Sequence, residues 1–366
     1  MPTSLDWRGL FQLSFNFFLM KQASFLLMND IHVSKDNISE FQDNWNEALE
    51  ICKSQKIKEI IVGGDMFQSR SSQTLDVLLA VKHALIQTRY AGVRVTIAEG
   101  NHDLVNQESC DGYNQVFSEY DMVDVISDYA IIEVSDDIDL FVMSYFPENG
   151  SFVERYNDMV KTDLMLNKKN ILYLHEGIRG GLSTPSDDEL PATMFKQFDC
   201  VLVGHYHNRK KIPGTNIEYI GSSRQHNFGE DEEKGYTILY NDGSYQFVRN
   251  NVNTRYKVID VMNISQLNEN VLKYITELKN SGKYKIKLRI QCKSSEASMV
   301  DKQKLVELGV TKIEFVTEDV KAVATASQGL EKKFDKNGIK EEYSSFCADH
   351  GVSNVEIGLY YLGKIK

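Results

Sequence analysis

The chain has 366 residues, of which 42% are apolar and 25% charged, and its formal net charge is −11. This length exceeds one compact core and predicts two domains, or one domain with an appendage. No apolar run reaches the roughly 18 residues that cross a bilayer, so we expect no membrane partner. Five widely spread cysteines without a Cys-x-x-Cys pair argue against a disulfide framework and a thiolate zinc site, and favour a reducing, cytoplasmic compartment.

Charge is distributed unevenly along the chain. Residues 255–366 hold 19 basic and 15 acidic side chains, a balance of +4, and the remainder has a balance of −15. Acidic side chains are expected where cations bind, and a basic C-terminal third would tolerate a phosphate backbone. Ordinary variation in surface charge explains the difference equally well.

The N-terminal residues 1–19 contain a short aromatic stretch. We interpret them as a dispensable extension, with the folded protein beginning near Met20. The alternative is a signal peptide, which the weakly basic start and the lack of a clear cleavage site disfavour.

Strands and helices alternate in the first part of the chain. A capping-box pattern at Ser39–Gln42 predicts the start of one helix, and Gly92 predicts the end of another. Short apolar runs bounded by glycine and polar residues predict strands, so we expect a largely parallel sheet covered by helices. The expected elements are a strand at 24–28, a helix at 39–53, a strand at 60–62, a helix at 73–90 and a strand at 93–98.

Consecutive strands follow residue 120. Runs at 123–127, 129–134 and 139–145 predict an antiparallel part of the fold. A helix is expected at 151–166, strands at 171–174 and 200–203, and a hairpin around Asn241-Asp242-Gly243.

A small separate α/β unit begins near residue 256. Its predicted order is a strand at 256–261, a helix at 265–280, a strand at 284–292, a helix at 301–308 and a strand at 311–317. The domains are therefore expected at 20–254 and 255–319, with a linker at 320–333 and a partner-binding C-terminal segment at 334–366. In that segment Ile339, Tyr343, Phe346 and Cys347 predict an amphipathic helix; alternatively it folds back on the chain, with Val355–Leu359 as a strand.

Polar clusters come directly after the predicted strands. They contain five of the eight histidines, and their mixture of carboxylate, imidazole and amide groups suits an open catalytic site for manganese, iron or zinc. Ligands bind at the carboxyl ends of strands in α/β sheets, and period-2 geometry turns both side chains of a His-x-His pair to one side. The clusters are Asp30-Ile31-His32, Gly64-Asp65, Gly100-Asn101-His102-Asp103, His175-Glu176 and Gly204-His205-Tyr206-His207.

This order of clusters resembles the calcineurin-like metallophosphoesterase superfamily, over about residues 24–240. The details, including Tyr219–Ser222 and Lys234–Tyr236, are similar to the SbcD nucleases of recombination and repair. The resemblance implies an α/β sandwich of two mixed sheets flanked by helices, with residues 255–319 as a small capping domain.

The resemblance also implies site residues. One cation would be bound by Asp30, His32, Asp65 and His207, and a second by Asp65, Asn101, His175 and His205. His102 would be the catalytic acid. Separately, because Asp103 is adjacent to His102 in sequence, we expect Asp103 to orient it. SbcD-like nucleases often have a histidine where this chain has Gln68; Gln68 and His226 are the candidate substrate-binding residues.

The implied function is metal-dependent hydrolysis of DNA phosphodiesters with two divalent cations, manganese first, and magnesium, iron or zinc as alternatives. The implied partners are DNA, an SbcC-like ATPase that engages the C-terminal segment, and a second copy in a homodimer. There are two alternative functions. One is a stand-alone phosphatase or small-molecule phosphodiesterase, which would not require the C-terminal unit. The other is a catalytically silent metal-binding scaffold, which the complete ligand set disfavours.

Overall fold

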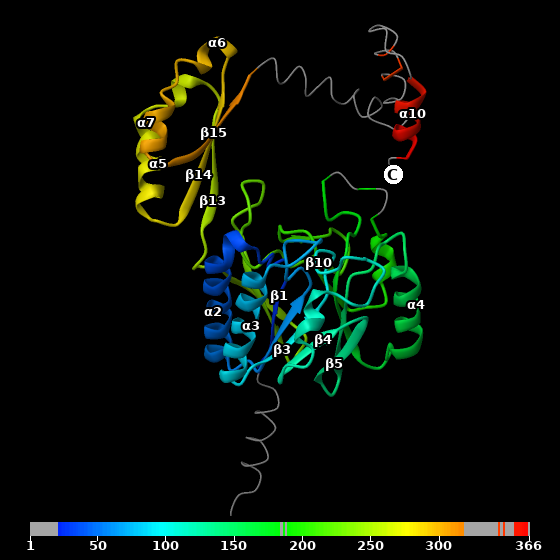
Figure 1. The fold of residues 1–366 in the computed structure, drawn as a ribbon. Coiled ribbons are helices and arrows are strands. Elements are labelled where there is room, and N and C mark those ends of the chain that lie inside the picture. The colour runs from blue at the N-terminus through cyan, green and yellow to red at the C-terminus, as the bar shows by residue number, and fades with distance from the viewer. Residues whose placement is uncertain are drawn as a thin grey trace, which may run out of the picture. The chain divides into compact units, whose positions relative to one another are not determined.

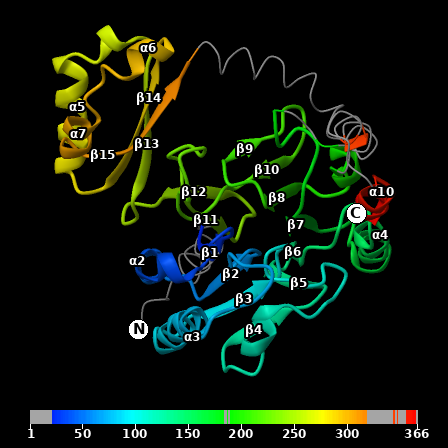
Figure 2. The ribbon, with the colours of Figure 1, turned by 45° about the horizontal axis from the view of Figure 1, so that its top comes forward.

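The computed structural model describes residues 21–183, 186, 189–317, 343–344, 347 and 355–364. It divides into two units, Met1–Tyr256 and Lys257–Lys366. The first unit contains two six-stranded sheets stacked face to face, with helices on the outer side of each (Figures 1 and 2). Both sheets combine parallel and antiparallel pairs, so the predicted sandwich of mixed sheets is confirmed.

The first sheet has the strand order β12-β11-β1-β2-β3-β4 and the second the order β5-β6-β7-β8-β10-β9. The strands of the first sheet are β1 (Ala23–Met28), β2 (Glu59–Gly63), β3 (Arg94–Ala98), β4 (Val123–Ile126), β11 (Gly235–Tyr240) and β12 (Tyr245–Arg249). Those of the second are β5 (Tyr129–Ser135), β6 (Ile138–Met143), β7 (Lys169–His175), β8 (Cys200–Gly204), β9 (Lys210–Lys211) and β10 (Ile217–Tyr219). The helices of this unit are α2 (Ile38–Gln55), α3 (Leu75–Tyr90) and α4 (Phe152–Asp163), with 3-10 turns η1 (Lys35–Asn37), η2 (Tyr113–Phe117) and η3 (Ala192–Phe195).

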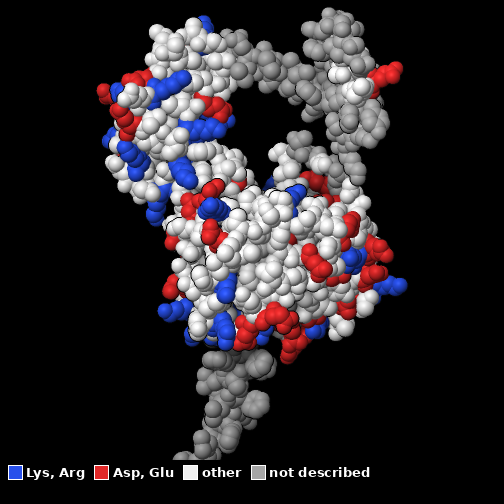
Figure 3. All heavy atoms as spheres, in the orientation of Figure 1, with Lys and Arg blue, Asp and Glu red and all other residues white. Residues whose placement is uncertain are grey.

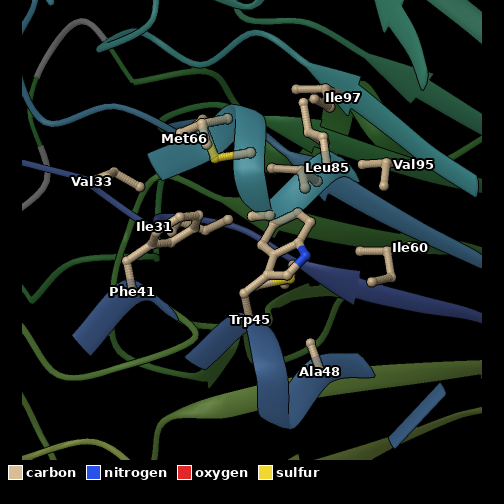
Figure 4. Close-up of a cluster of buried hydrophobic side chains, with 14 of the residues drawn as sticks. Ile31, Val33, Phe41, Trp45, Ala48, Ile60, Met66, Leu85, Val95 and Ile97 are labelled. Carbon is tan, nitrogen blue, oxygen red and sulfur yellow. The ribbon is translucent and has the colours of Figure 1, made fainter. Parts of the chain in front are cut away.

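The central strands are buried on both faces, which explains their continuous apolar sequences. In β1, Leu26 and Met28 join the core under α2 and α3, whereas Leu27 joins the core between the two sheets. Figure 4 shows Phe41 and Trp45 of α2 pointing into the first of these cores. A third core lies between the second sheet and α4.

The predicted antiparallel region between residues 123 and 145 is only partly correct. β4 pairs with β3 in parallel at the edge of the first sheet, β5 and β6 are antiparallel, and β6 pairs with β7 in parallel. The chain changes sheets across the two residues between β4 and β5. A short polar link of this kind has the sequence of a hairpin turn, and nothing local distinguishes the two.

The second unit holds a three-stranded sheet of order β13-β14-β15, in which β14 and β15 are parallel. Its core is apolar and includes Ile275, Leu288 and Leu305. Its elements are β13 (Arg255–Val261), η4 (Ile264–Gln266), α5 (Glu269–Asn280), β14 (Tyr284–Gln291), α6 (Ser294–Ala297), α7 (Lys302–Glu307) and β15 (Val310–Val316).

Near the C-terminus, Val355–Lys364 form the helix α10. A strand at Val355–Leu359, the alternative prediction, is therefore wrong. The predicted extension at 1–19 and the linker at 320–333 lie outside the described residues. Among the helices that the structure describes, none is both long and apolar enough to cross a bilayer.

Candidate metal centre

The two sheets bring their polar strand ends together. In the first sheet β1, β2 and β3 are mutually parallel, and in the second β7 and β8 are parallel. His175 at the end of β7 reaches Asp65 after β2, with Nε2 3.2 Å from Oδ2. The predicted ligands, which lie far apart in the sequence, therefore form one cluster between the sheets.

The backbone at this cluster adopts an unusual conformation. Among the described residues, six other than glycine have positive φ, and four of them are predicted ligands. L-residues avoid this region at a cost of about 1–3 kcal/mol, and such strain gathers at functional sites. These four are Asp30 (φ 51°), His32 (φ 51°), Asp65 (φ 54°) and His205 (φ 87°).

One group of predicted ligands surrounds His32. Its Nε2 lies 3.1 Å from Nε2 of His207, 3.5 Å from Oδ2 of Asp65 and 3.9 Å from Oδ1 of Asp30. Two ligands that each bind one ion at about 2.1 Å are separated by roughly 3.0–3.5 Å. The spacing within this group suits a shared cation.

The second group surrounds the Asn101 amide. One end of the amide lies 3.3 Å from Asp65 Oδ2, 3.3 Å from His175 Nε2 and 3.2 Å from His205 Nδ1. With its NH2 inward, the amide donates to Asp65 Oδ2 and His205 Nδ1, and its oxygen accepts from the Arg70 guanidinium. To bind a cation at this position, the Asn101 amide would have to turn over, so that its oxygen and not its NH2 group points inward.

The carboxylate of Asp30 tests whether the residues present fit a cation. Its Oδ2 accepts hydrogen bonds from the Asn29 side chain and from the backbone N–H of His205, but its Oδ1 is buried without a hydrogen-bond partner. Buried carboxylate oxygens are ordinarily satisfied. Since Oδ1 also faces His175 and His207, at 3.8 and 3.7 Å, the residues present fit divalent cations.

The protonation states differ across the centre. Burial lowers the pKa of His32 and His205 to about 4 against the pull of the carboxylates. Burial also opposes the charged form of His175, but Asp65 prevails and raises its pKa to about 9. Burial alone would raise the pKa of Asp65, but the surrounding histidines, His175 foremost, hold that pKa below its usual range. Without cations the centre therefore holds a proton on His175 at neutral pH.

This proton predicts a pH-dependent affinity for metal. Ligand imidazoles must be neutral, so a cation displaces the His175 proton below pH 9. The apparent affinity for Mn²⁺ should rise roughly tenfold per pH unit from pH 7 and level off near pH 9, where that proton is already lost. Calorimetric titration in buffers of different ionisation enthalpy measures the protons released; no release at pH 7.5 would contradict this assignment.

His102 lies at the exposed side of the centre. Its Nδ1–H donates to the Gln68 carbonyl at 2.7 Å, and its ring meets that of His32 edge-on at 4.8 Å. Its backbone N–H donates to Asp65 Oδ1 at 2.8 Å. The backbone of His102 thus holds the Asp65 carboxylate, and His102 forms with His32 and Asp65 a group that could hold a metal ion. Gln68 contributes its carbonyl, and its exposed side chain stays a substrate-binding candidate.

Asp103 does not orient His102 as predicted. Its carboxylate is fully buried and accepts hydrogen bonds from the backbone N–H groups of Gly100, Met66 and Phe67, at 2.8–3.2 Å. It therefore joins the loops after β2 and β3, which carry Asp65 and Asn101. Burial raises its pKa to about 7, and the Asp65 charge adds to the effect. The prediction rested on adjacency in sequence, which does not place side chains together.

The ring of His226 lies beside that of His32, with centroids 5.0 Å apart, and its Nε2–H donates to the Asp30 carbonyl at 2.8 Å. His226, His32 and His207 also form a group that could hold a metal ion.

Sequence reasoning missed three residues of the site. Asn29 is bonded to Asp30, Arg70 contacts Asn101, and Glu230 accepts a hydrogen bond from His207. Asn29 and Arg70 are close in sequence to predicted ligands and could have been suspected. Glu230 lies in a run of four acidic residues, a pattern that is typical of a solvated surface.

Comparisons with known proteins agree with this chemistry. A family model described as calcineurin-like phosphoesterase matches residues 23–209. The chain is 25% identical over 286 residues to the predicted phosphoesterase 244L of Invertebrate iridescent virus 6, covering 76% of this chain and 96% of that protein. A shorter match, 39% identical over 116 residues, is to the SbcD component of the nuclease SbcCD from Staphylococcus epidermidis and covers 27% of this chain and 30% of that protein.

Two solved structures have weaker likeness. A dimetal phosphatase from Danio rerio has 9% identity and a TM-score of 0.39, covering 60% of this chain and 93% of that one. The Pseudomonas putida nuclease MPE has 15% identity and a TM-score of 0.26, covering 52% and 65%. At these TM-scores the two structures support no conclusion about this chain.

Proposed function

Since the chain belongs to the calcineurin-like phosphoesterase family and is a metal-dependent phosphoester hydrolase, we propose that it is a two-cation nuclease acting on DNA in recombination or repair. One observation carries the two-cation part. Asp65 Oδ2 faces both ligand groups, at 3.5 Å from His32 Nε2 and 3.2 Å from His175 Nε2. A single carboxylate oxygen in this place suits a bridge between two ions.

Each residue of the centre then has a role in hydrolysis. Asp30, His32, Asp65 and His207 would hold one cation, and Asp65, Asn101, His175 and His205 the other. Bound cations supply a nucleophilic water at neutral pH and neutralise charge on the phosphoryl oxygens. His102 donates a proton from Nε2 to the leaving oxygen, and the Gln68 carbonyl holds the ring in place for that transfer. Manganese suits this mixture of imidazole and oxygen ligands.

DNA is favoured as the substrate by features outside the centre. The partial likeness to a component of an SbcCD nuclease covers 116 residues. The chain also has a second α/β unit, which a minimal phosphatase does not require, and residues 255–366 have a positive balance of charge. Figure 3 shows that lysine and arginine side chains on this unit are interspersed with aspartate and glutamate side chains. Positive charge attracts a phosphate backbone.

The proposal also covers the protein partner of the chain and the compartment in which it acts. We place residues 255–319 as a capping domain and 334–366 as the segment that engages an SbcC-like ATPase, in the cytoplasm. All five cysteines are free of disulfides, which suits a reducing compartment.

A nuclease assay separates this proposal from the phosphatase alternative. The protein should cleave linear duplex, single-stranded or hairpin DNA with Mn²⁺ and lose the activity in chelator. Hydrolysis of p-nitrophenyl phosphate without cleavage of any of these DNAs would favour the stand-alone phosphatase, and absence of both activities would favour the silent scaffold.

Arg70 is expected to bind the substrate phosphate. Its exposed guanidinium lies against Asn101, a predicted metal ligand, and places a positive charge beside the centre. A hydrogen bond to a charged group contributes roughly 1.5–3 kcal/mol, so Arg70→Ala should lower kcat/KM about 10- to 100-fold, mainly through KM. Arg70→Lys should recover part of the loss, and the exposed Arg89→Ala should have no effect. Unchanged kinetics in Arg70→Ala would exclude this role.

A further inference from the structure

The segment between β10 and β11 folds back onto a predicted metal ligand. Glu230 in this segment has a carboxylate whose two oxygens are both fixed. Oε1 accepts from Nδ1–H of His207 at 2.9 Å and from the Asn227 side chain at 2.8 Å, and Oε2 accepts from the backbone N–H of His226 at 3.1 Å. The Glu230 side chain is only 7% exposed, so a buried carboxylate meets the outer nitrogen of His207.

A buried lysine secures the same histidine from its other end. Lys234 is fully buried, and its ammonium donates to the His207 carbonyl at 2.5 Å and to the Asn208 side chain at 2.8 Å. The same ammonium lies 3.6 Å from Glu230 Oε2 and 3.3 Å from Asp231 Oδ1. Burying a charge is costly unless it is paired and hydrogen-bonded. Lys234 meets both conditions, and its ammonium thereby joins the Glu230 carboxylate to the carbonyl of His207.

Other histidines of the centre are held differently. The Nδ1 atoms of His32 and His175 bond to backbone carbonyls, those of Phe67 and Gly63, at 3.3 and 2.9 Å. A carbonyl fixes the tautomer, as a carboxylate does, but a carboxylate also increases the electron donation of the opposite nitrogen to a cation. Among these three predicted ligands, only His207 has a carboxylate as the hydrogen-bond partner of its Nδ1. It also has the most exposed side chain of the three, at 27%, where solvent would otherwise compete for it.

We propose that Glu230, held in place by Lys234, is a positioning residue that directs Nε2 of His207 at the cation of the His32 group and sets the affinity of that one position. The inference rests on the proposed two-cation function. The other position, around Asn101 and His175, has no contact with Glu230 among the described hydrogen bonds and should be unaffected.

The test is a titration of the metal-free full chain with Mn²⁺, followed by calorimetry, for wild type, Glu230→Ala, Glu230→Gln and a control. Loss of an outer partner typically weakens metal binding roughly 10- to 100-fold. We expect a loss of that size at one of two positions in Glu230→Ala and a smaller loss in Glu230→Gln, whose amide oxygen can still accept from His207. The control, Glu233→Gln, makes the same chemical change at an exposed residue three positions away and should leave both affinities unchanged.

Equal weakening of both positions, or no change in either, would overturn the proposal. If Glu230→Ala fails to fold, as judged by thermal unfolding, the isosteric Glu230→Gln decides alone. The two proposals can fail separately. A wild type that binds two Mn²⁺ but cleaves no DNA refutes the nuclease function and leaves the role of Glu230 to the titration, whereas a wild type that binds no Mn²⁺ refutes both.

Discussion

Replacing Asp65 with Asn should remove both cations and abolish hydrolysis. Asp65 Oδ2 faces the two ligand groups, and the neutral amide of asparagine can neither bridge two ions nor compensate their charge. We expect each affinity for Mn²⁺ to fall by more than the roughly 10- to 100-fold that loss of an outer partner costs. Metal content after dialysis and equilibrium titration measure the effect.

The matched control for this change is Asp43→Asn, which alters an exposed carboxylate on α2 in the same way. It should bind two ions like the wild type. An Asp65→Asn protein that retains two ions at unchanged affinity would show that the bridging assignment is wrong. Loss of a single ion would place Asp65 in one position only.

Replacing His102 with Asn should stop hydrolysis while both cations stay bound. The contact of His102 with Asp65 is made by its backbone N–H, at 2.8 Å, so the substitution leaves that carboxylate held. What is lost is the proton donor, and a positioned acid contributes roughly 10²–10⁴-fold to the rate. Cleavage of DNA should therefore fall by that factor, with metal content unchanged.

The nature of the leaving group provides the internal check. A p-nitrophenolate ion leaves without protonation, so His102→Asn should lose far less activity on bis-p-nitrophenyl phosphate than on DNA. The exposed His83→Asn on α3 is the control and should match the wild type on both substrates. An equal loss on both substrates would exclude His102 as the acid, and loss of the ions would make it a ligand.

Much of the centre could be predicted because its ligands follow a physical rule. Asp65, Asn101 and His205 follow apolar strands, and His175 is the last residue of one. Parallel strands end at the same edge of a sheet. The order of the clusters also resembles a family whose members bring two sheets together at one metal centre. That resemblance allowed the meeting of the two sheets to be predicted without any knowledge of tertiary contacts.

The rest depends on contacts that no local pattern records. Asp103 follows His102 in sequence, yet its carboxylate turns inward to three backbone N–H groups. Glu230 reaches His207 from 23 residues away, with β9 and β10 between them in the chain. The link between β4 and β5 has the length and polarity of a hairpin turn, and only the completed sheets show that it joins two of them.

Anomalous X-ray scattering from crystals grown with Mn²⁺ tests most directly whether Asp65 lies between two cations. We expect two manganese peaks about 3.5–4 Å apart, with Asp65 between them, one peak near His32 and His207 and the other near Asn101 and His175. A single peak, or two peaks that do not share Asp65, would contradict this placement of Asp65.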